Sequence, residues 1–219
     1  MASSRVMTAA PLEEPDDLDV RVIASERLTV FVDAVIAIAV TLLALDLPKP
    51  IGNTNAALLH SAYDQRAGYM AFVISFLVIA AHWRAHHSLF RYVTRLDGRV
   101  AGLTMAWLFM QVVTPFATAV ITGNGGFQVR FGFYAAVQVT AFILFSLIVR
   151  EIQRRRLHRA DIPPHLFSRI YLRTIGVGLG FAVSIPISFF TGWAYLCWIV
   201  APFVTLVVHR RILSRASVN

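Results

Sequence analysis

Charged residues are scarce in this sequence, and their scarcity excludes most water-soluble folds. Of the 219 residues, 15% are charged and 57% are hydrophobic, and the mean hydropathy is +0.65. A soluble domain of this length rarely carries so few charges. Cysteine is scarcer still, because Cys197 is the only one, and a single cysteine excludes a disulfide within the chain.

Catalytic motifs are also missing. The sequence contains no H-E-x-x-H, no G-x-S-x-G and no phosphate-binding loop, which are the patterns that metalloproteases, hydrolases and nucleotide-binding enzymes use. We therefore expect neither enzymatic activity nor a cofactor. No basic region precedes a short apolar core near the N-terminus, so no cleaved signal peptide is predicted.

What the sequence does contain is long apolar blocks. A hydrocarbon core about 30 Å thick requires roughly 20 helical residues, and helices are the default because lipid offers no hydrogen-bond partner to an open backbone. Six blocks qualify: 28–47, 67–90, 100–122, 128–149, 170–190 and 192–209. The sequence thus predicts an all-α membrane protein with six transmembrane helices per chain. It divides into a cytoplasmic N-terminal segment, a transmembrane domain and a cytoplasmic tail, over 1–26, 27–209 and 210–219.

The arginines predict the orientation of these helices. The net charge is +8, and the arginines gather before the first block, between the second and third, between the fourth and fifth, and after the sixth. The other side holds only Lys49, Arg66 and Arg130. This is the positive-inside pattern, which places both termini in the cytoplasm. We expect the run "REIQRRRLHR" (150–159) to attract anionic lipid headgroups and not nucleic acid, since no aromatic platform accompanies it.

One aspartate, Asp33, lies inside the first apolar block "RLTVFVDAVIAIAVTLLALDLP". An ionisable side chain at membrane depth is costly unless it is paired or hydrated. If the first two blocks pack antiparallel, Asp33 lies at the depth of the stretch "AAHWRAHH", which contains His82, Trp83 and Arg84. We expect Arg84 or His82, from this chain or from a neighbouring subunit, to satisfy the carboxylate.

The histidines of this stretch allow two other interpretations. His82 and His86 lie one helical turn apart, as metal ligands can, but the remaining histidines form no second cluster. We therefore expect no metal site. Alternatively, Asp33 and His82 could form a relay in a proton- or cation-coupled transporter, which is the alternative function that the sequence leaves open.

The remainder of the first block is uncharged until Asp46. Ile38, Leu42 and Leu45 share one helical face by their spacing, and Thr41 lies beside it. The Thr41 hydroxyl can either face a ligand or bond a backbone carbonyl one turn back. At the outer end, Asp46 can raise the local cation concentration or be an ordinary solvated residue.

The start of this block resembles a known family. Arg27-Leu-Thr-Val-Phe31-Val32-Asp33 is similar to the R-x-x-x-F-S-D motif of the transmembrane protein 175 family of potassium channels, and both "AIAVTLLALDLP" and "HWRAHH" resemble the stretches that follow in that family. The resemblance is strong over the first two blocks, and later blocks match in number and hydropathy. Val32 stands where the family has serine.

The resemblance implies an architecture and a function. A single six-helix repeat is similar to the short prokaryotic form, so it implies a homotetramer in the cell membrane of a prokaryote. The first helix would line a central pore permeable to potassium, with a hydrophobic constriction at Ile38, Leu42 and Leu45 and no carbonyl filter. Thr41 is the nearest hydroxyl for selectivity. The anchoring network would comprise these residues: Arg27, Phe31, Asp33, His82, Trp83 and Arg84.

Overall fold

The protein is a bundle of helices, described by a computed structural model over residues 17–159 and 165–216. Within these residues there are seven α-helices, a short 3₁₀ helix (η1) and no strand. They are α1 (Asp17–Leu45), α2 (Asn55–Asp64), α3 (Arg66–Phe90), α4 (Gly98–Thr122), α5 (Phe127–Arg154), α6 (His165–Ile187), η1 (Gly192–Tyr195) and α7 (Leu196–Ala216). The predicted all-α membrane fold is confirmed. Residues 1–16 and 217–219, which belong to the predicted cytoplasmic segments, lie outside the described residues.

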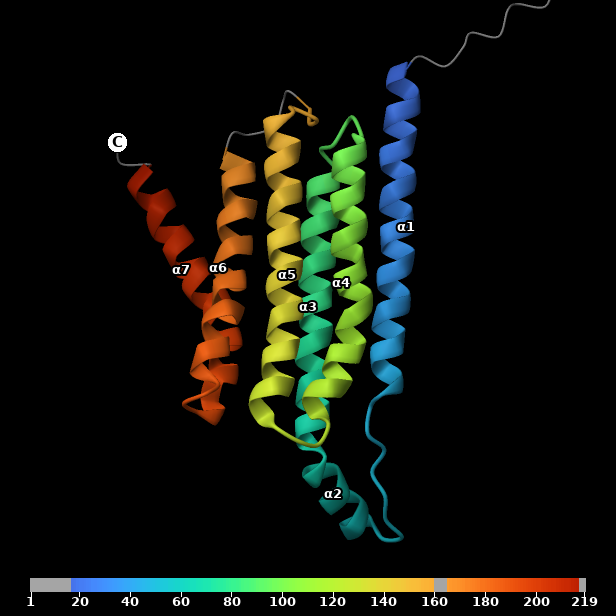
Figure 1. Ribbon diagram of the computed structural model, residues 1–219, viewed down its shortest axis with the longest axis vertical. Helices are drawn as coiled ribbons and strands as arrows, with labels where there is room; N and C mark the ends of the chain where they lie inside the picture. The colour runs from blue at the N-terminus through green and yellow to red at the C-terminus, as the bar shows by residue number, and fades with distance from the viewer. Residues whose placement is uncertain (1–16, 160–164, 217–219) are drawn as a thin grey trace, which may run out of the picture.

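Among the residues that the structure describes, five helices are long and apolar enough to cross a membrane: α1 from Ile23 onward, α3, α4, α5 and α6. They correspond to the first five predicted blocks. The sixth block corresponds to η1 and α7, whose apolar part, Gly192–Thr205, is shorter than the other five. The described chain nevertheless begins and finishes at the same end of the bundle (Figure 1), as an even number of crossings requires.

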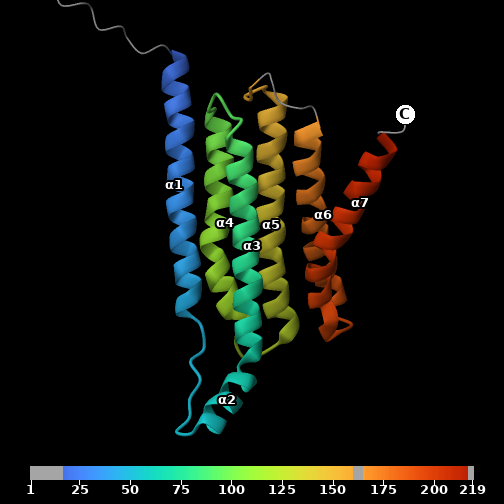
Figure 2. The same cartoon turned by 180° about the vertical axis from the view of Figure 1, so that it is seen from behind.

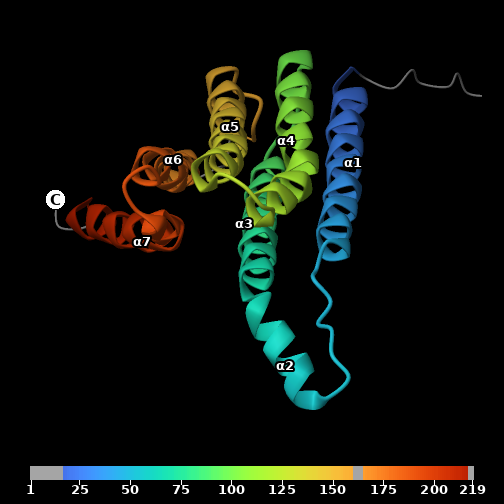
Figure 3. The same ribbon diagram turned by 60° about the horizontal axis from the view of Figure 1, so that its bottom comes forward.

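Helices α3, α4 and α5 form the centre of the bundle. Helix α1 packs against α3 and α4, α6 packs against α5, and α7 packs against α6. Seen from behind, α3 comes forward of α4 and α5, while α1 and α7 stand at opposite edges (Figure 2). Helix α1 therefore has neighbours from its own chain on one side only, which Figure 3 shows from a different angle.

Two elements differ from the sequence prediction. Helix α1 begins at Asp17, so it extends well beyond the apolar block, because nothing in the polar stretch before Arg27 breaks a helix. Helix α2 was not predicted: it is only 10 residues long, and none of its residues is buried. It forms because Thr54 caps its first turn, accepting a hydrogen bond from the Ala57 amide at 3.2 Å.

Large aromatic side chains fill the bundle at two depths. Trp107 and Phe145 are fully buried in a cluster that also contains residues of α1 and α3. Phe131, Tyr134 and Trp198 belong to a second cluster, which joins α4 and α5 to α6 and α7 near the end of the bundle where α5 begins. These clusters hold the central helices rigidly, so the outer helices rest on a fixed surface.

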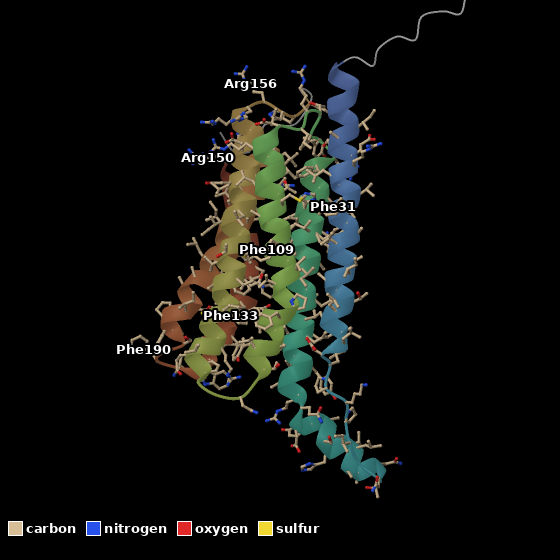
Figure 4. The ribbon with its side chains drawn as sticks, turned by 45° about the vertical axis from the view of Figure 1, so that its right-hand side comes forward. Phe31, Phe109, Phe133, Arg150, Arg156 and Phe190 are labelled. Atoms are coloured by element: carbon tan, nitrogen blue, oxygen red, sulfur yellow. The ribbon has the colours of Figure 1, made fainter. Side chains whose placement is uncertain are left out.

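Position along the bundle can be followed from labelled side chains. Arg150 and Arg156 lie toward the end where α1 begins, Phe190 lies toward the opposite end, and Phe109 and Phe133 lie between them (Figure 4). The arginine-rich segments thus gather at one end, as the charge pattern predicts. We call this end the arginine-rich end and the other the α2 end.

The two loops at the arginine-rich end are joined to each other. The Thr94 amide donates to the Leu157 carbonyl at 2.9 Å, and the Arg159 amide donates to the Tyr92 carbonyl at 3.0 Å. Arg155 bridges them through Asp97 at 2.7 Å and Glu151 at 2.5 Å. The two carboxylates are therefore neutralised by arginines, which leaves this end with a surplus of positive charge.

Candidate functional site

Helix α1 has two faces of similar hydrophobicity and opposite exposure. The face that packs on α3 and α4 buries Val32, Ile36, Ala39 and Leu43, each at most 4% exposed. The outward face carries Ile38, Leu42 and Leu45, which are 58%, 44% and 76% exposed. A large apolar face without a partner marks a surface that contacts lipid or another protein.

The three predicted constriction residues therefore share one face, as their spacing predicts. That face turns away from every helix that packs on α1. It continues toward the arginine-rich end through Phe31, which is 51% exposed, to Arg27, which is also exposed. The arginine and phenylalanine of the motif thus lie on the same stripe as the predicted constriction residues, while the half-buried Asp33 lies on the side of α1 that contacts α3.

The Thr41 hydroxyl bonds the backbone of its own helix. It donates to the Ile38 carbonyl at 2.7 Å, which is the second of the two alternatives that the sequence left open. The hydroxyl hydrogen is used in this bond, but the oxygen keeps lone pairs on the exposed side of α1. Selectivity at Thr41 stays a prediction on these grounds.

Asp33 bonds to α3, but not through the residues that we expected. Trp83 Nε1 donates to Asp33 Oδ1 at 2.9 Å, and His87 Nδ1 lies 3.7 Å from Asp33 Oδ2. The Trp83 and His87 rings lie 5.5 Å apart. The expectation that Arg84 or His82 of the same chain satisfies the carboxylate was wrong. Trp83 and His87 are four residues apart and share the side of α3 that faces α1.

His82 and His86 lie on a different side of α3, the one that faces α4 and α5 inside the bundle. Both are buried, at 2% and 0% exposure. The His86 ring stacks on Trp107 with centroids 5.0 Å apart, and the His82 ring lies 4.4 Å from that of Phe142. Among the residues that the structure describes, no group of three or more metal-ligating side chains comes together. These two histidines therefore pack as aromatic core residues.

Two further predicted positions lie at the ends of this arrangement. Val32 is fully buried, so the side chain that replaces the motif serine packs in the core between α1 and its neighbours. Asp46 is exposed and lines a cavity of ≈ 260 Å³ at the α2 end, together with Asp64 and Thr122. Both alternatives for Asp46 remain compatible with this position.

Sequence reasoning missed the role of His87 and the polar interior of α3, α4 and α5. Gln111 and Gln138 are completely buried, and both atoms of the Gln111 amide lack a hydrogen-bond partner. Gln111 lies near His82, but the two side chains make no hydrogen bond of good geometry with each other. The four-residue spacing of Trp83 and His87 could have identified the face that meets α1.

Fold and site together define a polytopic helical membrane protein whose first helix presents an apolar face to lipid or to another protein chain. A profile of the family described as endosomal/lysosomal potassium channel TMEM175 matches residues 27–115. A potassium channel of Streptomyces collinus is 33% identical over 178 residues, which are 75% of this chain and 85% of that protein. The chain belongs to the TMEM175 family, as the motif predicts.

Two other comparisons concern the size and the fold. The endosomal/lysosomal proton channel TMEM175 of Gallus gallus is 29% identical over 219 residues, covering 90% of this chain but 43% of that protein. The chain therefore has the length of its bacterial relative and not that of the animal protein. The crystal structure of a lysosomal potassium-selective channel TMEM175 homolog from Chamaesiphon minutus matches with a TM-score of 0.69 at 24% identity, over 86% of this chain and 98% of that one.

Proposed function

We propose that this protein is a potassium-permeable cation channel, assembled as a homotetramer with α1 of each subunit around a central pore. The observation that supports this proposal most is the outward face of α1, where Ile38, Leu42 and Leu45 are exposed while the opposite face of the helix is buried against α3 and α4. One helix cannot surround a pore, whereas four copies around an axis can. In that assembly the three side chains form stacked apolar rings.

The rings would act as a hydrophobic constriction. Their side chains offer no oxygen to a dehydrated ion, and a narrow apolar ring resists wetting, so it forms a barrier or a gate. The sequence contains no T-V-G-Y-G stretch. Selectivity for potassium would then depend on the width of the rings, on ion hydration and on nearby oxygen atoms, of which the Thr41 hydroxyl is closest. Relatives named as potassium channels support the choice of ion.

Asp33 anchors α1 in this proposal and does not contact permeating ions. Its hydrogen bond from Trp83 and its proximity to His87 tie α1 to α3. The anchor places the outward face at a fixed angle, because Asp33 lies within the same helix as the three constriction residues. Arg27 and Phe31, on the outward stripe, would meet a neighbouring subunit near the arginine-rich end.

The membrane orientation is part of the same proposal. We place the arginine-rich end, with both termini, in the cytoplasm, and 27–209 in the cell membrane of a prokaryote. Exposed arginines at this end, including Arg91, Arg95 and Arg150, would contact anionic lipid headgroups. As a passive pore the protein would need no cofactor and would catalyse no reaction.

The alternative, a proton- or cation-coupled transporter that uses Asp33 and His82, has less support. A relay requires the two groups to exchange a proton directly or through a short chain. Asp33 contacts Trp83 and His87 on the side of α3 that faces α1, whereas His82 packs against Phe142 of α5 and Trp107 of α4. Both ring nitrogens of His82 lack a hydrogen-bond partner within the described part of the chain, so His82 makes no bond to Asp33.

Electrical recording of the purified protein in planar bilayers tests the proposal. With potassium on one side and sodium on the other, a channel gives discrete unitary currents whose reversal potential favours potassium. Flux that stops without a coupled counter-ion gradient, or activity without unitary events, would overturn the proposal in favour of a transporter.

A further inference from the structure

A second cavity lies away from α1, between α3, α4, α5 and the start of α7, toward the α2 end. Its volume is ≈ 390 Å³, which lies within the range of about 300–1,000 Å³ that ligand sites occupy. Its walls are mostly apolar and include Met70, Ala71, Ile74, Trp198 and Ile199. None of the residues predicted from the sequence for ion permeation lines it.

The polar groups at the base of this cavity satisfy one another. Ser75 Oγ lies 3.0 Å from the Tyr134 hydroxyl and 2.8 Å from Thr118 Oγ1, which in turn lies 2.8 Å from the Thr114 carbonyl. Hydroxyls that already have partners gain little from a polar ligand. The base therefore suits a hydrocarbon better than a sugar, a peptide or an ion.

Arg130 is the exception in this wall. It lies in the first turn of α5, at the edge of the apolar span, and donates through Nη1 to the carbonyls of Ile121 at 2.7 Å and of Gly123, and through Nη2 to that of Gly125 at 3.1 Å. Its Nε is buried and has no partner. The ion pairs found among the described residues do not include Arg130.

An uncompensated guanidinium beside an apolar cavity favours an amphiphilic anion. Carbonyl oxygens orient the guanidinium but carry no full negative charge, so the arginine keeps an electrostatic preference for an anion. Phosphate oxygens accept hydrogen bonds from a planar guanidinium particularly well. The phosphates of lipids lie at the membrane boundary. We propose that the cavity binds one acyl chain of an anionic phospholipid whose phosphate is held by Arg130.

This binding site requires that the protein is embedded in a membrane, and it does not depend on ion conduction. The site differs from the arginine-rich end because it is at the opposite end of the bundle and because it holds the lipid by its chain and its headgroup together. Tyr195 and Trp198, which form part of the wall, would border the chain with aromatic surface.

Tryptophan fluorescence provides a direct test, because Trp198 lines the cavity. The full-length protein is reconstituted in phosphatidylcholine vesicles that contain an equal minor fraction of either brominated phosphatidylglycerol or brominated phosphatidylcholine. Bromine quenches tryptophan at short range. We expect stronger quenching by the anionic lipid, and we expect this difference to disappear in Trp198→Phe. Equal quenching of the wild-type protein by the two lipids would overturn the proposal.

Three variants locate the binding determinants. Arg130→Gln should lower the preference for the anionic lipid by about fivefold, as expected for one arginine near the membrane surface. Arg66→Gln is the matched control, because Arg66 is also a cation at the α2 end but stands over the Tyr63 ring at 4.4 Å. Ala71→Phe should reduce quenching by both lipids by filling the cavity.

The outcomes separate the proposal from simpler explanations. Equal losses in Arg66→Gln and Arg130→Gln would show attraction to surface charge only, and would overturn it. Because Arg130 also binds the Ile121 carbonyl of α4 and two carbonyls of the loop that follows, its replacement can impair folding. Ala71→Phe keeps Arg130 in place, so unchanged quenching in that variant would overturn the proposal independently. No ion flux is measured, so the result does not depend on whether the protein conducts potassium.

Discussion

The outward face of α1 and the interior between α3, α4 and α5 have opposite polarity. Large apolar side chains stand exposed on α1, whereas the three-helix interior buries serine, histidine, threonine and glutamine. The buried polar residues of these helices are Ser75, His82, His86, Thr104, Gln111, Thr114, Thr118 and Gln138, with Glu151 near the arginine-rich end. A water-soluble protein shows the reverse arrangement, so lipid or a neighbouring subunit must cover the exposed face.

The difference also indicates which region of the protein is held in a single arrangement. Interior polar groups such as Ser75, Tyr134 and Thr118 are linked by short hydrogen bonds, which commit the three helices to one arrangement. The outward face of α1 makes no such bonds apart from the Thr41 contact with its own backbone. A surface that makes no bonds to the rest of its own chain is suited to line a pore through which ions pass.

Two adjacent leucines of α1 should show the largest difference between the buried and the outward face. Leu43 is 2% exposed and Leu42 is 44% exposed. Leu43→Ala should lower the free energy of unfolding by about 2–5 kcal/mol, because it opens a cavity in the core. Leu42→Ala should cost far less. Denaturation of the two variants in matched detergent micelles measures the difference, and equal losses would show that Leu42 is packed as tightly as Leu43.

The interior hydroxyl network should respond to Ser75→Ala. This change leaves the Tyr134 hydroxyl without a partner, whereas Thr118 keeps its bond to the Thr114 carbonyl, and it should cost about 1–3 kcal/mol in the free energy of unfolding. Tyr134→Phe made in the same chain should recover part of the loss, because it removes one orphaned hydroxyl. A double-mutant cycle on unfolding free energies measures the coupling. Additive losses would show that the two hydroxyls do not stabilise each other.

The anchor between the two regions should show a smaller effect. Asp33 is 36% exposed, so Asp33→Ala should lower the stability of the assembled protein by about 1–2 kcal/mol. Asp33→Asn retains an acceptor for Trp83 and should lose less. Size-exclusion profiles and unfolding curves of both variants test this. An intact assembly with sharply altered ion selectivity would place Asp33 in the ion path instead.

The smallest expected effect is at Thr41. Its hydroxyl hydrogen is held by the Ile38 carbonyl, so only the oxygen lone pairs can favour an ion. Thr41→Val keeps the shape and removes the oxygen, and Thr41→Ala removes both. Bi-ionic reversal potentials should show a modest fall in the potassium-to-sodium ratio for both. An unchanged ratio in both variants would remove Thr41 from selectivity.

Much of this architecture was predictable because membrane spans are encoded by local hydrophobicity. Five spans and the shared face of Ile38, Leu42 and Leu45 follow from block length and helical spacing. The partner of Asp33 did not, because depth alone cannot tell which side of α3 faces α1: residues 82–84 lie at nearly the same depth and point in different directions. Helix α2 was missed because its stability comes from a local cap and not from an apolar pattern. Gln111 became notable only when three helices placed it beside His82.

The central claim is that the outward face of α1 lines the pore, and unitary conductance at Leu42 tests it most directly. Leu42→Ala should widen and wet the constriction, and Leu42→Asn should add polar ligands, so both should raise the single-channel current above wild type. The buried-face variant Ile36→Val, which keeps Leu42 and changes a side chain that is only 4% exposed, serves as the control and should leave the constriction in place. Unchanged conductance in both Leu42 variants, with assembly intact, would contradict the account and remove α1 from the ion path.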